Sequence, residues 1–223
     1  MGIDASSIIS SSAKIHPSVH VGPFCIIGDA VELGEGTSVL SHVIIKGPTK
    51  IGKNNVIYQF SSIGEDTKLT IGDNNIFREG VTVHRGTVQD KGVTGIGSDN
   101  LFMAYTHIAH DCVIGNNNIF ANNAGLAGHV TIGNFVVMGG YSAVHQFCCL
   151  GDHSFLGMNT SVTMDIPANS IATLKKAFKL VYKKELKLNE AIKELDLILS
   201  DTSDIYLETF IKSIKTSSRG ILR

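Results

Sequence analysis

The histidines of this chain are numerous, and their positions point to proton-transfer chemistry. The sequence has nine histidines in 223 residues, and His107, His110, His129 and His145 fall in one region. The ordinary pKa of imidazole lies near neutral pH, so histidine often acts as a general base. Asp111 directly follows His110, and a neighbouring carboxylate can fix the tautomer of a catalytic histidine. The sequence therefore predicts a proton-abstracting site at His110 and Asp111.

A possible oxyanion donor lies one structural repeat further along the chain. Gly128 precedes His129, about 18 residues after His110. A glycine at this position can present its backbone N–H to a developing negative charge. His110 and Gly128 together suit a reaction through a tetrahedral intermediate.

Two other interpretations of the histidines compete with catalysis. Any single histidine can be an ordinary exposed side chain, although none takes an inward position of the repeat described next. A zinc site is the other interpretation, because histidine is a frequent zinc ligand. The histidines occupy different positions within their repeats, so we do not expect them to stack as ligands, and we predict no metal.

A strict short repeat must position these residues. Apolar anchors occupy every sixth position from Ile3 to Leu69 and again from Ile96 to Val162. A small residue usually stands two positions before each anchor, so both side chains face the same side of a strand. Gly, Asn or Asp follows many anchors and suits a tight turn. The pattern predicts a mainly β protein, a parallel β-helix of triangular section with roughly nine coils of about 18 residues each.

Interruptions and a change of period divide the chain. The stretch 84–95 contains no anchor and is expected to leave the β-helix as an external loop. Helical spacing replaces the hexad after Pro167, over 174–199 and 203–216. We therefore expect a β-helix over 1–172 and a C-terminal α-helical cap over 173–223, which would cover the last coil.

Composition excludes several classes of protein. The net charge of −1 gives no support for nucleic-acid binding, and no apolar run is long enough to span a membrane. No signal peptide opens the chain. Cys25, Cys112 and Cys148 fall at inward positions and Cys149 lies beside one, so we expect reduced thiols and a cytoplasmic protein without a stable membrane insertion.

Longer motifs carry a family resemblance over nearly the whole chain. They are HVGPFCIIG (20–28), FREGVTVHRGT (77–87), GSDNLFMAYTHIAHDC (97–112), ANNAGLAGHV (121–130), AVHQFC (143–148) and SSRGILR (217–223). The chain resembles the acyl-carrier-protein-dependent UDP-N-acetylglucosamine O-acyltransferases, which begin lipid A synthesis. These motifs are far more specific than the hexad itself, which many acetyltransferases and γ-type carbonic anhydrases share. The resemblance implies a left-handed β-helix and a homotrimer with clefts between subunits.

The resemblance also implies roles for single residues. His110 would be the general base, Asp111 would orient it, and the Gly128 N–H would bind the oxyanion. Other matching positions would line the substrate cleft or begin the nearby loop: His84, Arg85, His107, His129, His145 and Gln146. The implied partners are acyl carrier protein with a hydroxyacyl chain and UDP-N-acetylglucosamine, and no cofactor is implied. Met158 stands where the family limits the length of the acyl chain, so we expect donors of about ten carbons.

The chain departs from the family on the acceptor side. Only Asp66-Thr67-Lys68 remains of a longer segment whose Asp and Lys reach the acceptor, and Asp66 and Lys68 could preserve that pair. The family also has roughly thirty more residues after Thr173, some of which contact the nucleotide sugar. Two alternatives to the family reaction therefore stay open: a paralogous acyltransferase with another acceptor, and a non-catalytic trimeric binding protein.

Overall fold

The structure is a computed structural model that describes residues 2–65, 67–88, 92–166, 170–182, 186–202 and 204–215. The chain divides into two compact units, Met1–Ile166 and Pro167–Arg223. The sequence-based boundary at 172/173 lies six residues later, inside the first helix, which begins at Ser170. The hexad ends before that point, and helical spacing alone did not reveal where the helix starts.

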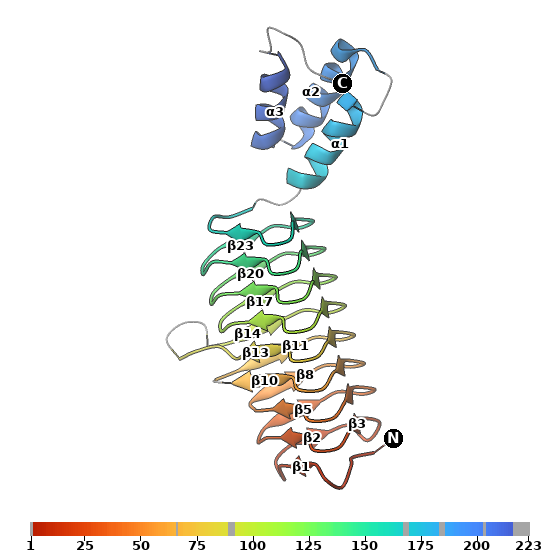
Figure 1. Cartoon of the computed structure of the whole chain (residues 1–223), viewed down its shortest axis with the longest axis vertical. Helices are drawn as coiled ribbons and strands as arrows, with labels where there is room; N and C mark the ends of the chain where they lie inside the picture. Colours follow the sequence, from red (N-terminus) through yellow and green to blue (C-terminus); the bar gives the residue numbers. More distant parts are fainter. Residues whose placement is uncertain are drawn as a thin grey trace. The chain divides into compact units, whose positions relative to one another are not determined.

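Short parallel strands stack into three sheets in the first unit (Figure 1). Sheet 1 consists of β1 (Ile8–Ile9), β4 (Ile26–Ile27), β7 (Ile44–Ile45), β10 (Ser62–Glu65), β13 (Thr82–His84), β16 (His107–Ile108), β19 (Gly125–Leu126), β22 (Ala143–Val144) and β25 (Ser161–Val162). Sheet 2 consists of β2 (Lys14–Ile15), β5 (Val31–Leu33), β8 (Thr49–Ile51), β11 (Leu69–Ile71), β14 (Thr94–Ile96), β17 (Val113–Ile114), β20 (Thr131–Ile132) and β23 (Cys149–Leu150). Sheet 3 consists of β3 (His20–Val21), β6 (Ser38–Val39), β9 (Val56–Ile57), β12 (Ile76–Phe77), β15 (Leu101–Phe102), β18 (Ile119–Phe120), β21 (Val137–Met138) and β24 (Phe155–Leu156).

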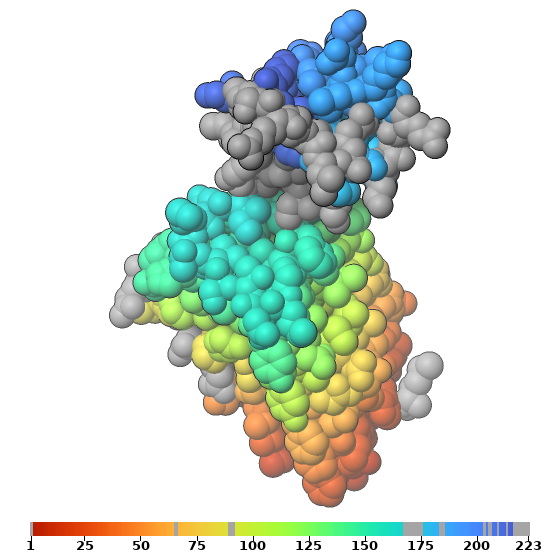
Figure 2. All heavy atoms as spheres, turned by 45° about the horizontal axis from the view of Figure 1, so that its top comes forward, coloured from red at the N-terminus to blue at the C-terminus, as the bar shows by residue number. Residues whose placement is uncertain are grey.

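This arrangement is the parallel β-helix that the hexad predicts. Each strand pairs with the strand three places further along the chain, as Ile27 does with Ile45. Sheet 1 has 9 strands and the other two have 8 each, so the described chain makes eight complete coils and one further strand, slightly fewer than expected. Figure 2 shows the coils as successive colour bands along this unit.

The anchors fill the interior of the β-helix. Those of the central coils are fully buried; Phe77 stacks on Phe102 with ring centroids 5.0 Å apart, and Phe102 meets Phe120 edge to face at 5.1 Å. Some of the small inward residues bond to the next coil, as where the Thr37 hydroxyl donates to the Gly52 carbonyl at 2.9 Å. A side chain such as Thr37 is therefore both buried in the interior and hydrogen-bonded to the next coil.

Most of the glycines that follow the anchors are needed for space and not for a left-handed backbone; Gly64, with a φ of 91°, is an exception. Positive φ occurs two residues later at the corners, often at bulky residues such as Phe24 and Phe60. A Cβ on Gly52 would lie 2.6 Å from the Gly72 carbonyl oxygen of the next coil. At such a position the glycine is required because the neighbouring coils approach each other closely.

The external loop is pinned where it leaves the β-helix. The number of residues between paired positions of neighbouring coils increases there, so that Val83 pairs with Ile108. The Thr94 and Gly86 N–H groups both donate to the Lys68 carbonyl, at 3.1 and 3.0 Å. These bonds join the two sides of the loop to the short segment 67–68.

The described part of the second unit contains three helices: α1 (Ser170–Tyr182), α2 (Leu188–Thr202) and α3 (Ile205–Lys215). Buried Val181, Leu195 and Ile211 form part of its own core. The sequence predicted helix over 174–199, but α1 ends at Tyr182 and α2 begins at Leu188. Among the described residues, no helix has the length and apolarity needed to cross a membrane.

Candidate active site

His110 and Asp111 form a hydrogen-bonded pair at the corner between β16 and β17. His110 Nδ1 lies 3.0 Å from Asp111 Oδ2. The Asp111 side chain is 0% exposed, whereas His110 is 37% exposed. A buried carboxylate acts as an acceptor, so the proton of neutral His110 sits on Nδ1 and leaves Nε2 free to accept another. The predicted base and its orienting acid are therefore in contact.

Thr87 supplies the remaining bonds of Asp111. Its backbone N–H donates to Oδ1 at 3.2 Å and to Oδ2 at 3.0 Å, and its hydroxyl donates to Oδ2 at 2.8 Å. Burial by itself raises the pKa of Asp111, but the hydrogen bonds from Thr87 and His110 outweigh it and hold the pKa below its ordinary value. Asp111 is therefore ionised at neutral pH. Sequence reasoning missed Thr87, whose presence in a family motif was the only signal.

Gly128 lies directly against the His110 ring. A Cβ on Gly128 would lie 2.6 Å from His110 Cε1 and 2.8 Å from Nε2, closer than real Cβ atoms approach. The Gly128 N–H donates to no acceptor among the described residues, while the adjacent Ala127 and His129 N–H groups do. An unused N–H beside an imidazole base is the arrangement that acyl transfer requires.

His129 extends the site by one coil. Its ring meets the His110 ring edge to face, with centroids 5.0 Å apart, and stacks on exposed Phe147 at 4.6 Å. The sequence predicted that the four histidines would not stack as one ligand set, and of these four the ligand group of the described residues contains only His110 and His129. The ligand atoms of His110, Asp111 and His129 lie within 4.8 Å of one another, close enough to raise the question of a metal.

The contacts within this group favour proton transfer over metal binding. Both Asp111 oxygens already accept hydrogen bonds, from Thr87 and His110.

His84 and His107 form a second pair on sheet 1. Their rings meet edge to face with centroids 5.0 Å apart, and His107 Nδ1 lies 2.7 Å from the Thr82 hydroxyl. Burial, together with the charge of His84, lowers the pKa of His107. His107 is therefore neutral at neutral pH and suits hydrogen bonding more than binding of an anion. Arg85 Nη1 donates to the Thr67 carbonyl at 3.4 Å, which ties this arginine to the loop neck.

The other predicted site residues stand outside these two groups. His145 and Gln146 are exposed, and His145 Nδ1 lies 3.2 Å from the Gln146 carbonyl oxygen. Met158 is 70% exposed in the corner after β24, and the Lys68 side chain is exposed. Asp66 lies outside the described residues. No described contact joins these side chains to His110.

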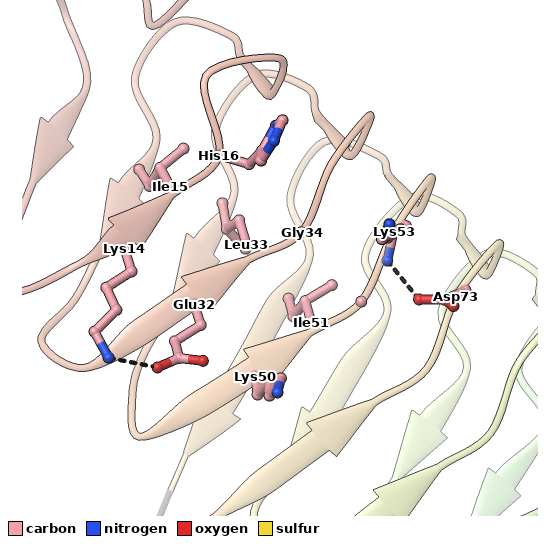
Figure 3. Close-up of a pocket in the computed structure, with 11 residues that line it drawn as sticks. Lys14, Ile15, His16, Glu32, Leu33, Gly34, Lys50, Ile51, Lys53 and Asp73 are labelled. Atoms are coloured by element: carbon pink, nitrogen blue, oxygen red, sulfur yellow. Dashed lines mark hydrogen bonds and ion pairs between the residues drawn. The ribbon is translucent and has the colours of Figure 1, made fainter.

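A hollow of about 540 Å³ lies elsewhere, on the N-terminal part of sheet 2 (Figure 3). Lys14 Nζ pairs with Glu32 Oε1 at 2.8 Å, and the Lys53 N–H donates to Asp73 Oδ1 at 2.6 Å. Lys14 and Glu32 in the hollow thus pair with each other, and Asp73 accepts a backbone hydrogen bond. None of the predicted site residues lines it, so its size alone does not mark a catalytic site.

Comparison with known proteins agrees with this geometry. Residues 94–128 match the bacterial transferase hexapeptide family, and residues 164–222 match the second domain of the UDP-N-acetylglucosamine O-acyltransferases. The chain is 45% identical to the acyl-[acyl-carrier-protein]–UDP-N-acetylglucosamine O-acyltransferase of Stutzerimonas stutzeri over 257 aligned positions, and the alignment covers 99% of each chain. The protein of that name from Saccharophagus degradans is 46% identical with the same coverage.

Solved structures show the same similarity in three dimensions. The UDP-N-acetylglucosamine O-acyltransferase of Moraxella catarrhalis superposes with a TM-score of 0.77 at 42% sequence identity, and the match covers 100% of both chains. Identity at this level over full length, together with the site geometry, shows that this chain is an acyltransferase of the acyl-[acyl-carrier-protein]–UDP-N-acetylglucosamine O-acyltransferase family.

Proposed function

We propose that this protein transfers an (R)-3-hydroxyacyl group from acyl carrier protein to the 3-hydroxyl of UDP-N-acetylglucosamine, the opening step of lipid A synthesis. The observation that carries the proposal is the oriented His110 beside the unused Gly128 N–H. We place the reaction in the cytoplasm, because all four cysteines are free thiols, as expected in a reducing compartment.

In this proposal His110 Nε2 takes the proton of the sugar hydroxyl as its oxygen attacks the thioester carbonyl. The negative charge that forms on the carbonyl oxygen is stabilised by the Gly128 N–H. Collapse of the intermediate breaks the carbon–sulfur bond, and the carrier thiolate takes the proton back from His110. Ionised Asp111 stabilises the imidazolium that exists between the two transfers, and the base is regenerated without a cofactor.

We further infer that the active form is a homotrimer. Aromatic side chains follow the corner between sheets 3 and 1, where Phe24, His42 and Phe60 rings lie 5.1 and 5.4 Å apart and Phe60 is 67% exposed. Apolar side chains also point outward from the two adjoining sheets: Ile8, Ile26, Ile44, Ile76, Ile119 and Phe155. Sheet 2 instead carries a ladder of Lys14, Glu32 and Lys50. An exposed apolar strip beside a charged face is typical of an assembly surface.

The oligomer can be tested by light scattering on the full chain. A wild-type mass of three copies and a smaller mass for Phe60→Glu would support the trimer. Lys50→Ser on sheet 2 is the matched control and should keep the wild-type mass. A wild-type protein that runs as a monomer would refute the trimer.

One observation supports a second candidate for the acceptor half of the reaction. The alignments to relatives extend over 257 positions, more than the 223 residues of this chain, so the relatives contain internal residues that this chain lacks. From the resemblance we expect the missing residues near Lys68 and after Thr173, both on the acceptor side. An acyltransferase with a different or smaller acceptor is therefore the alternative. Mass spectrometry of the product formed with UDP-N-acetylglucosamine decides between them.

Substitution of His110 tests the catalytic part of the proposal. His110→Ala should lower turnover by about 100-fold while thermal unfolding stays unchanged, because the ring is partly exposed and its role is chemical. His16→Ala, a histidine on the distant sheet 2 hollow, is the control and should retain wild-type turnover. Near-wild-type turnover in His110→Ala would remove His110 as the base. Binding of acyl carrier protein without any product would favour a non-catalytic role.

A further inference from the structure

The neck of the external loop is bonded to the carboxylate that orients the base. Thr87 directs its backbone N–H and its hydroxyl at Asp111, and the hydroxyl and His110 Nδ1 share the same oxygen, Oδ2, at 2.8 and 3.0 Å. We propose that Thr87 is a positioning residue of the reaction, which holds Asp111 in the geometry that aligns His110. The proposal rests on the proposed role of His110 as general base.

The loop neck is itself fixed by the segment at 67–68. The Thr67 N–H donates to the Gly86 carbonyl at 3.0 Å, and its hydroxyl donates to the Gly92 carbonyl, also at 3.0 Å. The Gly86 N–H returns a bond to the Lys68 carbonyl. A continuous set of bonds therefore leads from this short segment through Gly86 and Thr87 to Asp111.

The Thr87 hydroxyl has a specific electrostatic effect. Asp111 is fully buried and its charge is distributed among a few donors, so each charge-assisted bond matters. Loss of the hydroxyl leaves Asp111 with the single Thr87 backbone N–H, which both carboxylate oxygens share, and with the bond to His110. Oδ2 then interacts more strongly with the imidazolium that forms on His110 during the reaction, while the ring loses part of its orientation. The titratable groups in described contact with His110 are Asp111 and His129, and neither is altered.

The test compares Thr87→Val with Thr87→Ser in the full-length protein. Valine keeps the shape and removes the hydroxyl, whereas serine restores it. Turnover is followed by thiol release from hydroxyacyl carrier protein with UDP-N-acetylglucosamine as acceptor, between pH 5 and pH 9. We expect about a 10-fold lower kcat for Thr87→Val, an acid limb that moves to higher pH, and recovery of both in Thr87→Ser.

Matched variants distinguish a positioning role of the Thr87 hydroxyl from a purely structural one. Thr131→Val makes the same change on sheet 2 at a residue with no described contact to Asp111, and should keep the wild-type profile. A wild-type profile for Thr87→Val would overturn the proposal, as would equal losses in both Thr87 variants with an unmoved acid limb. If Thr87→Val does not fold, Thr87→Ala is measured against the same criteria. Full activity in His110→Ala would refute the base itself and not the Thr87 connection alone.

Discussion

Gly128→Ala tests the position of the base without removing the oxyanion donor. The substitution keeps the backbone N–H, and Gly128 has no positive φ that would make alanine strained. The added Cβ would lie 2.6 Å from His110 Cε1, 2.8 Å from Nε2 and 3.1 Å from Nδ1. Since ordinary contact begins at 3.4 Å, the whole imidazole ring must retreat.

The distance that the ring must move determines the expected loss of reaction rate. The ring must move by about 1 Å to reach ordinary contact, and a misplacement of about 1 Å in a catalytic group typically costs about 100-fold in rate. The movement also strains the 3.0 Å bond to Asp111, so Nε2 loses its alignment. Because His110 is partly exposed, the ring can swing outward, and we expect only a small change in unfolding temperature.

The assay is steady-state turnover at saturating hydroxyacyl carrier protein. We expect the loss of about 100-fold to appear in kcat, and we expect the KM for the acceptor to change less than kcat. Gly95→Ala is the control, because a Cβ there would meet only the Thr70 hydroxyl at 3.8 Å on sheet 2. If Gly128→Ala turns over within threefold of wild type, the close contact between Gly128 and His110 does not position the base, and the reasoning fails.

Three further predictions concern Asp111, the acyl chain and the acceptor. Asp111→Asn should lower the free energy of unfolding at pH 7, measured by urea titration. The pKa of Asp111 in the folded protein lies below its ordinary 3.8, so the stabilisation from the ionised carboxylate is complete above pH 3.8 and is lost as the pH falls through the lowered pKa. A difference between the two proteins that persists in stronger acid would contradict this expectation. Met158→Gly should shift the preference from hydroxyacyl donors of about ten carbons toward fourteen, since each buried methylene is worth about 0.8 kcal/mol, and unchanged relative rates would remove Met158 as the limit. The calorimetric affinity for UDP-N-acetylglucosamine should be weaker than that of relatives with the longer segments, because each missing charged hydrogen bond typically costs about 1.5–3 kcal/mol, and equal affinity would contradict this expectation.

The architecture and the central pair of the site could be predicted from the sequence. The hexad from Ile3 to Val162 repeats a local preference, strand then corner, and stacking is the only way to bury every anchor. The adjacency of His110 and Asp111 in the chain guaranteed that they would be neighbours. The helical unit was also visible from its spacing, but the break between Tyr182 and Leu188 was not.

Contacts between coils were decided by the tertiary structure. Thr87 and Asp111 are 24 residues apart and not 18, because the external loop changes the spacing between those two coils. His110 and His129 meet although their hexad positions differ, and Gly128 is needed because the His110 ring occupies the space of its side chain. A periodic sequence specifies which residues face inward, since that depends on near neighbours in the chain. Which outward side chains meet depends on register and on the loops between coils, and those are fixed only when the coils stack.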